Sequence, residues 1–239
     1  PGPHWLRFEL RVMPRRGPER KLTGHLFGQG GGDGAATKLT STDTAVTGAS
    51  NTEMLLWRSG AEATAWQWNA GQRGETPRQL DLSALFDPLQ QTDLTPFDLL
   101  MPFLRWPDFV YEGVANVRGR PAHAFLLYPP APLPAPVRGE LVPAAVRVFL
   151  DTQFSAMTQA EWLDAAGATL KSFTVLDLKK TGDQWMVKSI DLRNHTTRAK
   201  TRFSVLAVAT GLELPRWLFQ PEHIATPEPE VPAERIERL

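Results

Sequence analysis

Five consecutive segments in the later part of the chain decide the fold, because apolar and polar residues alternate over much of their length. They are AVRVFLD (145–151), MTQAEWL (157–163), LKSFTVLDLK (170–179), QWMVKSIDLR (184–193) and TRFSVLAV (201–208). A period of two predicts β-strands with one face turned towards the core. The breaks between them, such as DAAG (164–167) and TGD (181–183), have the composition of turns. We therefore expect an antiparallel meander.

The same alternation covers most of the earlier part of the chain. Residues 6–12 place apolar side chains at every second position, with Arg, Glu and Arg between them. Further candidate strands are 22–27, 38–47, the predicted hairpin 53–58 with 64–69, and the predicted hairpin 109–118 with 122–128. The total is about ten to twelve strands at the spacing of a barrel, a sandwich or a large sheet. The expected fold is mainly β: a large curved antiparallel sheet, or incomplete β-barrel, with short helices as a plug or a lid.

The helices are expected in one apolar segment, residues 79–106, which departs from the alternation. Its apolar residues at 82, 85, 86 and 89 have helical spacing. Thr95-Pro96-Phe97-Asp98 supplies an N-cap, a proline at the first helical position and an acid at the third. Prolines at 88, 102 and 107 limit any helix here to two or three turns. Such a segment is either a plug for an open sheet end or a mobile lid.

Composition excludes several classes of function. The 26 basic residues balance the 26 acidic ones, whereas a nucleic-acid binder needs a concentrated surplus of basic residues. The chain has no cysteine, so it has no disulfide, no thiolate nucleophile and no Cys-ligated metal. No run of 18 apolar residues is present that would span a bilayer as a helix. The opening at Pro1 suggests a processed or trimmed chain, and the sequence leaves open whether a targeting segment or a lipid-bearing cysteine precedes residue 1.

Searches for catalytic and metal-binding motifs give no site. The glycine run at 28–34 lacks the Gly-Lys-Ser/Thr of a phosphate loop, and the five histidines lack zinc spacing. No Gly-x-Ser-x-Gly elbow is present. Asp151, at the end of a strong strand, is the best-placed acid, but a role as a turn acceptor explains it equally well. We expect no enzyme activity, no cofactor and no metal.

Three stretches are expected to be loosely structured: residues 28–34, the loop 128–143 with its six prolines, and the Pro- and Glu-rich end at 221–239. None of them separates the strands into two convincing cores. We therefore expect one domain over residues 1–220, followed by a C-terminal tail at 221–239.

A surplus of large apolar side chains remains, with eight Trp against two Tyr. One interpretation is an ordinary core with its plug. The other is an apolar cavity half-covered by short helices, in which binding is driven by buried area, at about 0.8 kcal/mol per methylene. The candidate cavity and lid residues are Leu55, Trp57, Trp66, Trp68, Phe97, Leu100, Met101, Phe103, Leu104 and Trp106.

Residues 95–223 also carry a family pattern. It consists of DFVYEG (108–113), RGR (118–120), VRVFLD (146–151), AEWLD (160–164), the Gly167 turn with Leu170-Lys171, WMVKSIDLRN (185–194) and TRFSV (201–205). In this pattern the chain resembles the outer-membrane lipoprotein-sorting proteins, the LolA/LolB-like superfamily of periplasmic lipoprotein carriers. The chain departs from that family in lacking an amphipathic helix before Trp5 and in its Gly-rich and Pro-rich loops.

The resemblance implies an incomplete antiparallel barrel around an apolar cavity, with residues 93–106 as part of the lid. It also implies a non-enzymatic carrier in the periplasm, whose partners are lipoprotein acyl chains or another apolar ligand. The alternative is a structural or interaction module of the cell envelope, which recruits a protein partner through a sheet edge or a loop such as 129–143.

Overall fold

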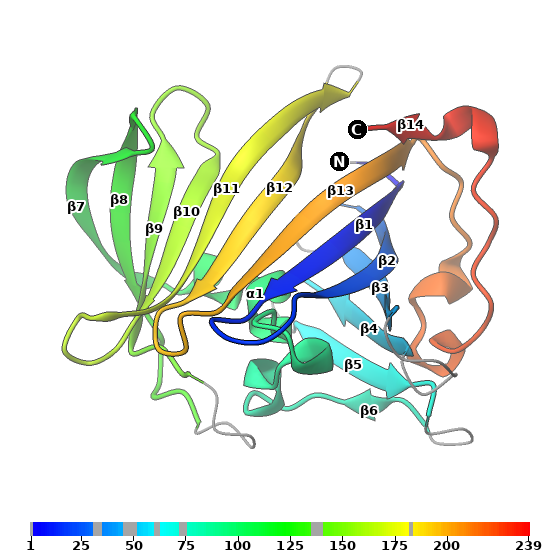
Figure 1. The fold of residues 1–239 in the computed structure, drawn as a ribbon, viewed down its shortest axis with the longest axis horizontal. Helices are drawn as coiled ribbons and strands as arrows, with labels where there is room; N and C mark the ends of the chain where they lie inside the picture. The colour runs from blue at the N-terminus through cyan, green and yellow to red at the C-terminus, as the bar shows by residue number, and fades with distance from the viewer. Residues whose placement is uncertain are drawn as a thin grey trace. The chain divides into compact units, whose positions relative to one another are not determined.

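A computed structural model of the chain describes residues 2–30, 35–44, 52–59, 63–71, 76–134, 141–181 and 184–239. It is 53% strand and 12% helix, and its strands form a 14-stranded antiparallel sheet that does not close into a barrel (Figure 1). The strand order is β6-β5-β4-β3-β2-β1-β13-β12-β11-β10-β9-β8-β7, with β14 beside β13. This confirms the predicted open antiparallel sheet with short helices.

Twelve of the strands have six residues or more. They are β1 (His4–Met13), β2 (Arg20–Gln29), β3 (Ala36–Asp43), β4 (Thr52–Arg58), β5 (Thr64–Asn69), β7 (Asp108–Val117), β8 (Arg120–Tyr128), β9 (Ala145–Asp151), β10 (Met157–Leu163), β11 (Thr169–Thr181), β12 (Gln184–Asn194) and β13 (Lys200–Thr210). Each corresponds to a predicted strand, and β5, β9 and β10 match their predicted bounds. The strands β6 (Arg78–Gln79) and β14 (Glu237–Arg238) are too short for any periodicity to reveal.

The helices are all short. They are the 3-10 turns η3 (Ala84–Phe86), η4 (Leu89–Gln91), η5 (Pro102–Arg105), η6 (Arg216–Phe219), η7 (Pro221–His223) and η8 (Ala233–Arg235), and the α-helix α1 (Pro96–Leu100). Thr95 caps α1 with Pro96 at its first turn, as the sequence predicts, whereas the helical spacing at 82–89 corresponds only to the 3-10 turn η3 and the start of η4. Within the part of the chain that is described, no helix is long and apolar enough to cross a membrane.

Several predicted connections lie outside the described residues: 31–34 of the glycine run, 45–47 of the predicted strand 38–47, Gly60 and Ala61, 135–140 of the Pro-rich loop, and Gly182 with Asp183. Contacts group the rest into two compact units. Unit 1 comprises residues 1–11, 20–81 and 203–239, and unit 2 comprises residues 12–19 and 82–202. The predicted division into a domain at 1–220 and a tail at 221–239 stays a prediction.

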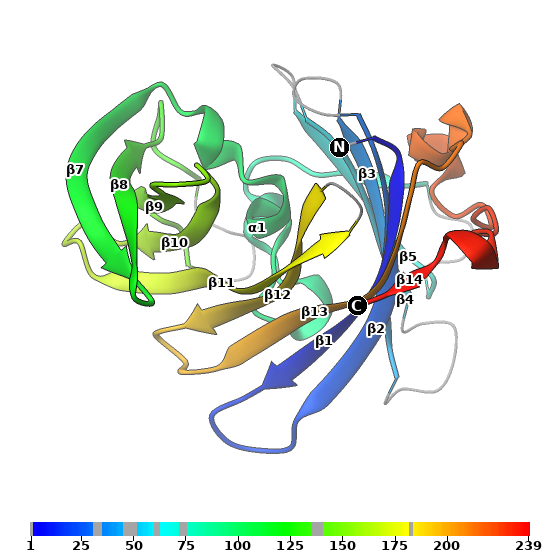
Figure 2. The same ribbon diagram turned by 90° about the horizontal axis from the view of Figure 1, so that it is seen from above.

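The core of unit 1 lies between one sheet face and the C-terminal segment, residues 211–239, which we call the strap. The apolar face is contributed by Trp5, Phe27, Ala36, Leu56, Ala207 and Ala209. Leu218, Phe219 and Ile224 of the strap are buried against it. Figure 2 shows the strap, orange to red, beside these strands. Three residues of the strap, Leu218, Phe219 and Ile224, are therefore part of the unit 1 core.

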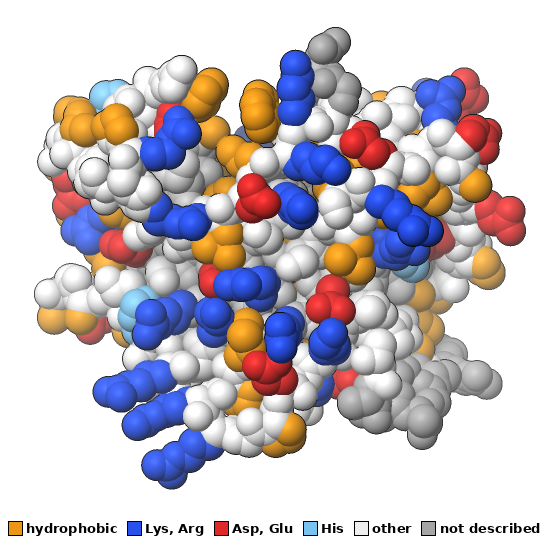
Figure 3. All heavy atoms as spheres, turned by 45° about the horizontal axis from the view of Figure 1, so that its top comes forward, with side chains coloured by type: hydrophobic (Ala, Val, Ile, Leu, Met, Phe, Trp, Pro, Cys, Tyr) orange, Lys and Arg blue, Asp and Glu red, His pale blue; other side chains and the backbone are white. Residues whose placement is uncertain are grey.

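The surface mixes both signs of charge, as the zero net charge requires. Figure 3 shows acidic and basic side chains interspersed over much of the face that it draws, with a group of Lys and Arg side chains at the lower left. Apolar side chains also reach this surface in small groups.

Packing in unit 1 predicts the effect of one substitution. Phe8 stacks on Phe203, with ring centroids 4.8 Å apart, and its edge lies over Gly24. A Cβ added at Gly24 would clash with the backbone carbonyl oxygen of Thr40 and would lie 2.6 Å from Cζ of Phe8, so Gly24→Ala forces both the β2–β3 pairing and the ring to move. We expect Gly24→Ala to lower the free energy of unfolding by about 1–3 kcal/mol in chemical denaturation. Gly2→Ala is the control, because a Cβ at Gly2 meets nothing within 4 Å. Equal stability of the two variants would contradict this packing.

Candidate functional site

The candidate site is a continuous apolar face of unit 2 that runs from β12 to β7. Residues directly opposite each other in antiparallel strands point to the same face. Pairing places two rows of side chains across these six strands, namely Asn194–Lys171–Trp162–Val146–Leu127–Phe109 and Leu192–Phe173–Ala160–Val148–Phe125–Tyr111. With the exception of Asn194 and Lys171, the rows carry apolar or aromatic side chains.

Burial along the rows changes sharply at the last strand. From β12 to β9 every member is buried, with Leu192 only 1% exposed and Val146 fully buried. On β7, Phe109 is 58% exposed and Tyr111 50% exposed. The two rings pack against Phe125 of β8, at centroid distances of 6.0 and 5.2 Å. The apolar face is therefore covered from β12 to β9 and exposed on β7.

The cover is residues 82–106, which we call the cover segment. Phe97 of α1 lies between Phe86 and Phe103, at centroid distances of 4.6 and 5.8 Å, and Trp106 joins the same cluster. Phe103 meets Trp162 of the first row edge-on at 6.1 Å. The cover segment is thus joined to the sheet face by aromatic contacts.

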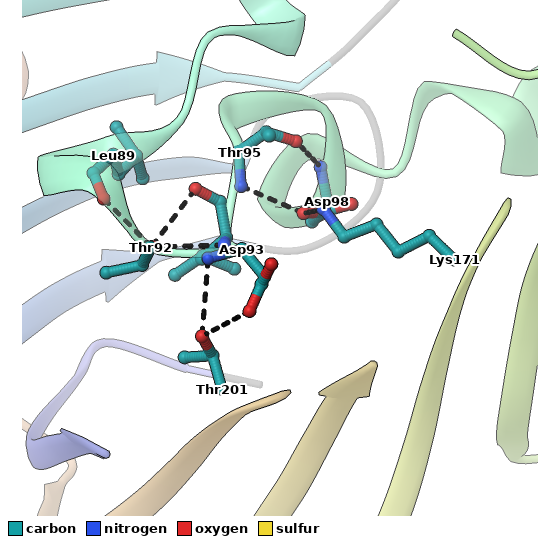
Figure 4. A network of polar contacts seen from close by, with 8 residues as sticks. Leu89, Thr92, Asp93, Thr95, Asp98, Lys171 and Thr201 are labelled. Atoms are coloured by element: carbon teal, nitrogen blue, oxygen red, sulfur yellow. Dashed lines mark hydrogen bonds and ion pairs between the residues drawn. The ribbon is translucent and has the colours of Figure 1, made fainter. Parts of the chain in front are cut away.

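An ion pair joins the cover segment to Lys171, the second residue of the first row (Figure 4). The Nζ of Lys171 donates to Oδ2 of Asp98, and the Lys171 and Asp98 side chains are 10% and 1% exposed. The same Asp98 oxygen accepts from the backbone N–H of Thr95 at 2.8 Å and completes a capping box. Lys171 Nζ also lies 5.5 Å from the ring centre of Trp162. A single carboxylate therefore both starts α1 and holds it to β11.

A second polar contact joins the cover segment to β13. Thr201 Oγ1 donates to Asp93 Oδ2 at 3.1 Å and accepts from the backbone N–H of Asp93 at 3.3 Å. Thr92 stabilises the adjacent turn by donating to the carbonyl of Leu89 at 2.8 Å. Burial raises the pKa of Asp93, although hydrogen bonds from Thr201 and Asn194 and the charge of Lys171 act in the opposite direction.

Asp151, the best-placed acid in the sequence, has a structural role in unit 2. Asp151 accepts from the backbone N–H groups of Gln153 and Phe154 and from Nε of Arg120. Burial acts to raise the pKa of Asp151, but these three donors outweigh it and the pKa is lowered. Asp151 is therefore a turn acceptor, the second of the two interpretations from sequence.

One Ser–His pair was not visible in the sequence. Ser172 Oγ and His195 Nε2 lie 3.0 Å apart on an exposed part of the sheet. The nearby carboxylate of Glu161 is engaged by Arg147 and Gln159. Among the described residues, no group of three or more His, Asp or Glu is placed to hold a metal ion.

The structure brings together only some of the ten residues predicted for the site. Phe97, Phe103 and Trp106 form the aromatic cluster of the cover segment, with Leu100 and Met101 half-buried beside them in sequence and Leu104 51% exposed.

The other four predicted residues lie in unit 1 and occupy two opposite faces. Trp66 and Trp68 pair with Leu56 and Met54 and pack on the strap side. Leu55 and Trp57 alternate with Leu56 on β4 and therefore face the other way, where both are buried. Period two alone places Trp66 and Trp68 on one face of β5. Which residues of β4 share that face depends on the register between β4 and β5.

Sequence reasoning did not select the sheet residues of the rows. Trp162, Phe173 and Val148 lie in strands that were predicted, and their alternation was visible. What was missing was the pairing that joins them to Tyr111 and Phe109, because register between strands is not encoded in the period of any one strand.

Comparisons with known proteins bear on the fold. A family model described as "-like: Uncharacterized protein" matches residues 49–226. Among curated proteins, none matches the chain. A domain named as an outer membrane lipoprotein-sorting protein from Vibrio parahaemolyticus is similar at 17% identity and TM-score 0.74, with 93% of this chain and 91% of that chain covered.

Two further solved structures share the fold. A DUF1329 family protein from Desulfovibrio piger has TM-score 0.73 at 13% identity, covering 91% of this chain and 89% of that one. A LolA superfamily protein from Nitrosomonas europaea has TM-score 0.64 at 12% identity, covering 92% and 90%. The predicted resemblance in fold to the LolA/LolB-like superfamily is confirmed.

The Asp98–Lys171 pair yields a prediction. Asp98→Ala leaves the Lys171 ammonium buried without its carboxylate and removes the capping box of α1. We expect the free energy of unfolding to fall by about 3–5 kcal/mol, with faster amide hydrogen exchange over residues 96–105. Asp108→Ala, at an exposed acid that begins β7, is the control. Unchanged exchange over 96–105 in Asp98→Ala would show that this ion pair does not hold the cover segment.

For Asp93 we expect the opposite effect, a substitution that raises the free energy of unfolding. Because its pKa is raised by burial, the folded chain binds a proton at Asp93 more readily than the unfolded chain. Its contribution is therefore most favourable below the ordinary Asp pKa, and stability is lost as pH rises through the folded pKa. We expect Asp93→Asn to stabilise the protein at pH 7 in urea denaturation, and to make little difference at a pH below about 3.9. A loss of stability at pH 7 would contradict this.

Proposed function

The chain belongs to the family whose model matches residues 49–226, and from this premise and the half-covered apolar face we propose that it is a non-enzymatic carrier. Its ligands are lipoproteins or other molecules that bear acyl chains, and its place of action is the periplasm. The ligand's chains lie on the face formed by β7–β12, and the cover segment acts as their lid.

The observation that carries this proposal is the fall in burial along the two rows. If the apolar face served only as a core, it would stop where the cover segment stops. Here Phe109, Tyr111 and Val114 of β7 remain 50–61% exposed on the face that also carries the buried Trp162 and Phe173. Exposed apolar patches of this kind mark binding surfaces.

Energetics favour an acyl chain as the occupant. Each methylene that leaves water for an apolar face contributes about 0.8 kcal/mol, so several acyl carbons bind without a polar anchor. The aromatic rings of Phe109 and Tyr111 supply broad contact area for such a chain. If the acyl chain displaced Phe97, Phe103 and Trp106, its binding site would extend under the cover segment.

The comparisons support the same function at the level of fold. The Vibrio parahaemolyticus domain is named for lipoprotein sorting, and the Nitrosomonas europaea protein for the LolA superfamily. A carrier binds its ligand without reacting with it. An apolar face whose polar contacts are structural is suited to such a role. The other predicted cavity residues, Leu55, Trp57, Trp66 and Trp68, are kept as candidates for contact with ligand in unit 1.

One observation favours the alternative of an envelope interaction module. β7 ends the strand order and pairs, among the described strands, with β8 alone. An open edge strand with exposed apolar side chains can accept a strand from a protein partner. This alternative uses the edge of β7, whereas the carrier uses its face.

Native mass spectrometry of gently purified protein tests the carrier function. We expect a native mass greater than the denatured mass, with the difference matching acyl-chain species, because area-driven binding retains its ligand during purification. A bare native mass that persists after incubation with a diacylated lipopeptide would overturn the carrier and favour the interaction module.

Substitutions on β7 test the site itself. The double variant Phe109→Ser with Tyr111→Ser removes exposed apolar area, so we expect its affinity for the lipopeptide, followed by Trp fluorescence, to fall about tenfold or more. Because both side chains are exposed, stability should change little. Phe154→Ser is the matched control, since Phe154 is 57% exposed but lies in the β9–β10 turn outside the rows. An equal loss in the control would contradict the assignment of the face.

A further inference from the structure

A fully buried lysine lies in the middle of the apolar face of unit 1. Lys38 of β3 is 0% exposed. Its direct partners in the sheet are Phe27 of β2 and Leu56 of β4, both members of the apolar cluster beneath the strap. Lysine is almost never fully buried without a partner, because its ammonium group loses its hydration. An ammonium at this position therefore implies an anion above the face.

In this structure the anion is Glu228 of the strap. Its Oε1 lies 3.2 Å from Lys38 Nζ and accepts from Thr40 Oγ1 at 2.7 Å, and its Oε2 contacts Nε2 of His25. The approach of Glu228 to Lys38 is an ion pair without hydrogen-bond geometry, so Nζ is left without a hydrogen-bond acceptor. Burial lowers the pKa of Lys38 in spite of Glu228.

His25, Lys38 and Thr40 form one polar group on this face. His25 pairs directly with Thr40 across β2 and β3, and Lys38 is two residues from Thr40 on the same side of β3. Burial acts to raise the pKa of Glu228, but His25, Lys38 and Thr40 outweigh it and the pKa is lowered. The three side chains therefore constitute a built recognition site for a carboxylate.

The strap supplies apolar side chains next to this carboxylate. Leu218, Phe219 and Ile224 are 0–3% exposed against the face, and Val231 and Ile236 are partly buried on it. Apolar groups followed by a carboxylate are the chemistry of a long-chain carboxylic acid. The strap thus occupies its face as an amphiphile would.

The attachment of the strap is local and short. It consists of 3-10 turns of three or four residues and the two-residue strand β14, which pairs with Ala207 and Val208 of β13. Arg58 adds one hydrogen bond to the carbonyl of Phe219 at 2.8 Å. Short elements of this kind have little stability of their own, so an occupant that replaces the strap's contacts can displace it.

We propose that the face of β2–β5 beneath the strap is a second ligand site, which binds a long-chain fatty acid with its carboxylate on Lys38, His25 and Thr40. The strap is its built-in competitor, and Glu228 holds the headgroup position. The site lies wholly within unit 1 and does not depend on the carrier face of unit 2. While the strap is seated, the apparent affinity for fatty acid is reduced by the fraction of molecules in which the face is open.

Titration with dodecanoate below its micellar concentration tests the proposal. Glu228→Gln removes the competing charge, so we expect it to bind dodecanoate about tenfold more tightly than the unaltered chain. Glu230→Gln is the matched control, because Glu230 is an exposed strap carboxylate two residues away. Dodecanol, which has the chain without the carboxylate, should gain much less from Glu228→Gln.

Amide hydrogen exchange separates this site from the face of unit 2. Bound dodecanoate should speed exchange over residues 224–239 in Glu228→Gln, and the double variant Phe109→Ser with Tyr111→Ser should leave that response intact. Combining Lys38→Met with Glu228→Gln removes both charges together and should abolish the preference for dodecanoate over dodecanol. Equal dodecanoate affinity in Glu228→Gln and the unaltered chain, with strap exchange unaffected by ligand, would overturn the proposal. If Lys38→Met fails to fold, His25→Gln with Glu228→Gln replaces it, and an undiminished carboxylate preference there would also overturn it.

Discussion

Antiparallel register from β12 to β7 is the constraint on which the unit 2 site depends. Each strand supplies only an alternation of apolar and polar side chains, and pairing decides which of its two faces joins the neighbour's apolar face. A shift of one residue at any pair would move Tyr111 and Phe109 to the face opposite Trp162. Register shifts occur between β7 and β8, β9 and β10, β10 and β11, and β11 and β12. All fall outside the two rows or at their edge, so the rows stay continuous across the sheet.

Both units place a lysine within an apolar sheet face and meet it with a carboxylate from a covering segment. In unit 2 the pair is Lys171 with Asp98, and in unit 1 it is Lys38 with Glu228. A buried pair of this kind adds little net stability, because desolvation offsets the attraction, yet removing one partner is costly. Its effect is therefore on position: it fixes where the covering segment lies and makes any other seating leave a buried charge unpaired. In unit 1 the same property makes an external carboxylate an acceptable substitute for Glu228.

Local sequence signals predicted the elements well, and contacts between distant residues were not predictable. The bounds of β5, β9 and β10 follow from period two, and the start of α1 follows from Thr95, Pro96 and Asp98, because these signals act within a few residues. Three features depend on contacts between distant residues: the two rows, the opposite faces of Leu55 and Trp66, and the contact of Glu228 with Lys38. A charged residue in an extended strand, as Lys38 is, gives no sign in sequence of whether it is solvated or buried.

The short helical elements explain how covering segments can be both ordered and displaceable. Prolines at 88, 96 and 102 hold the cover segment to turns of three to five residues, well below the length at which a helix is stable alone. Its order therefore comes from what it touches: Trp162 through Phe103, Lys171 through Asp98, and Thr201 through Asp93. A long helix would keep its own hydrogen bonds after leaving the sheet, so it would move away as a rigid body and stay folded. Under the proposed function, an acyl chain would take over the contacts of Phe97, Phe103 and Trp106. Because the segment has no intrinsic stability, its order would then rest on polar contacts such as Asp98 with Lys171 and Asp93 with Thr201.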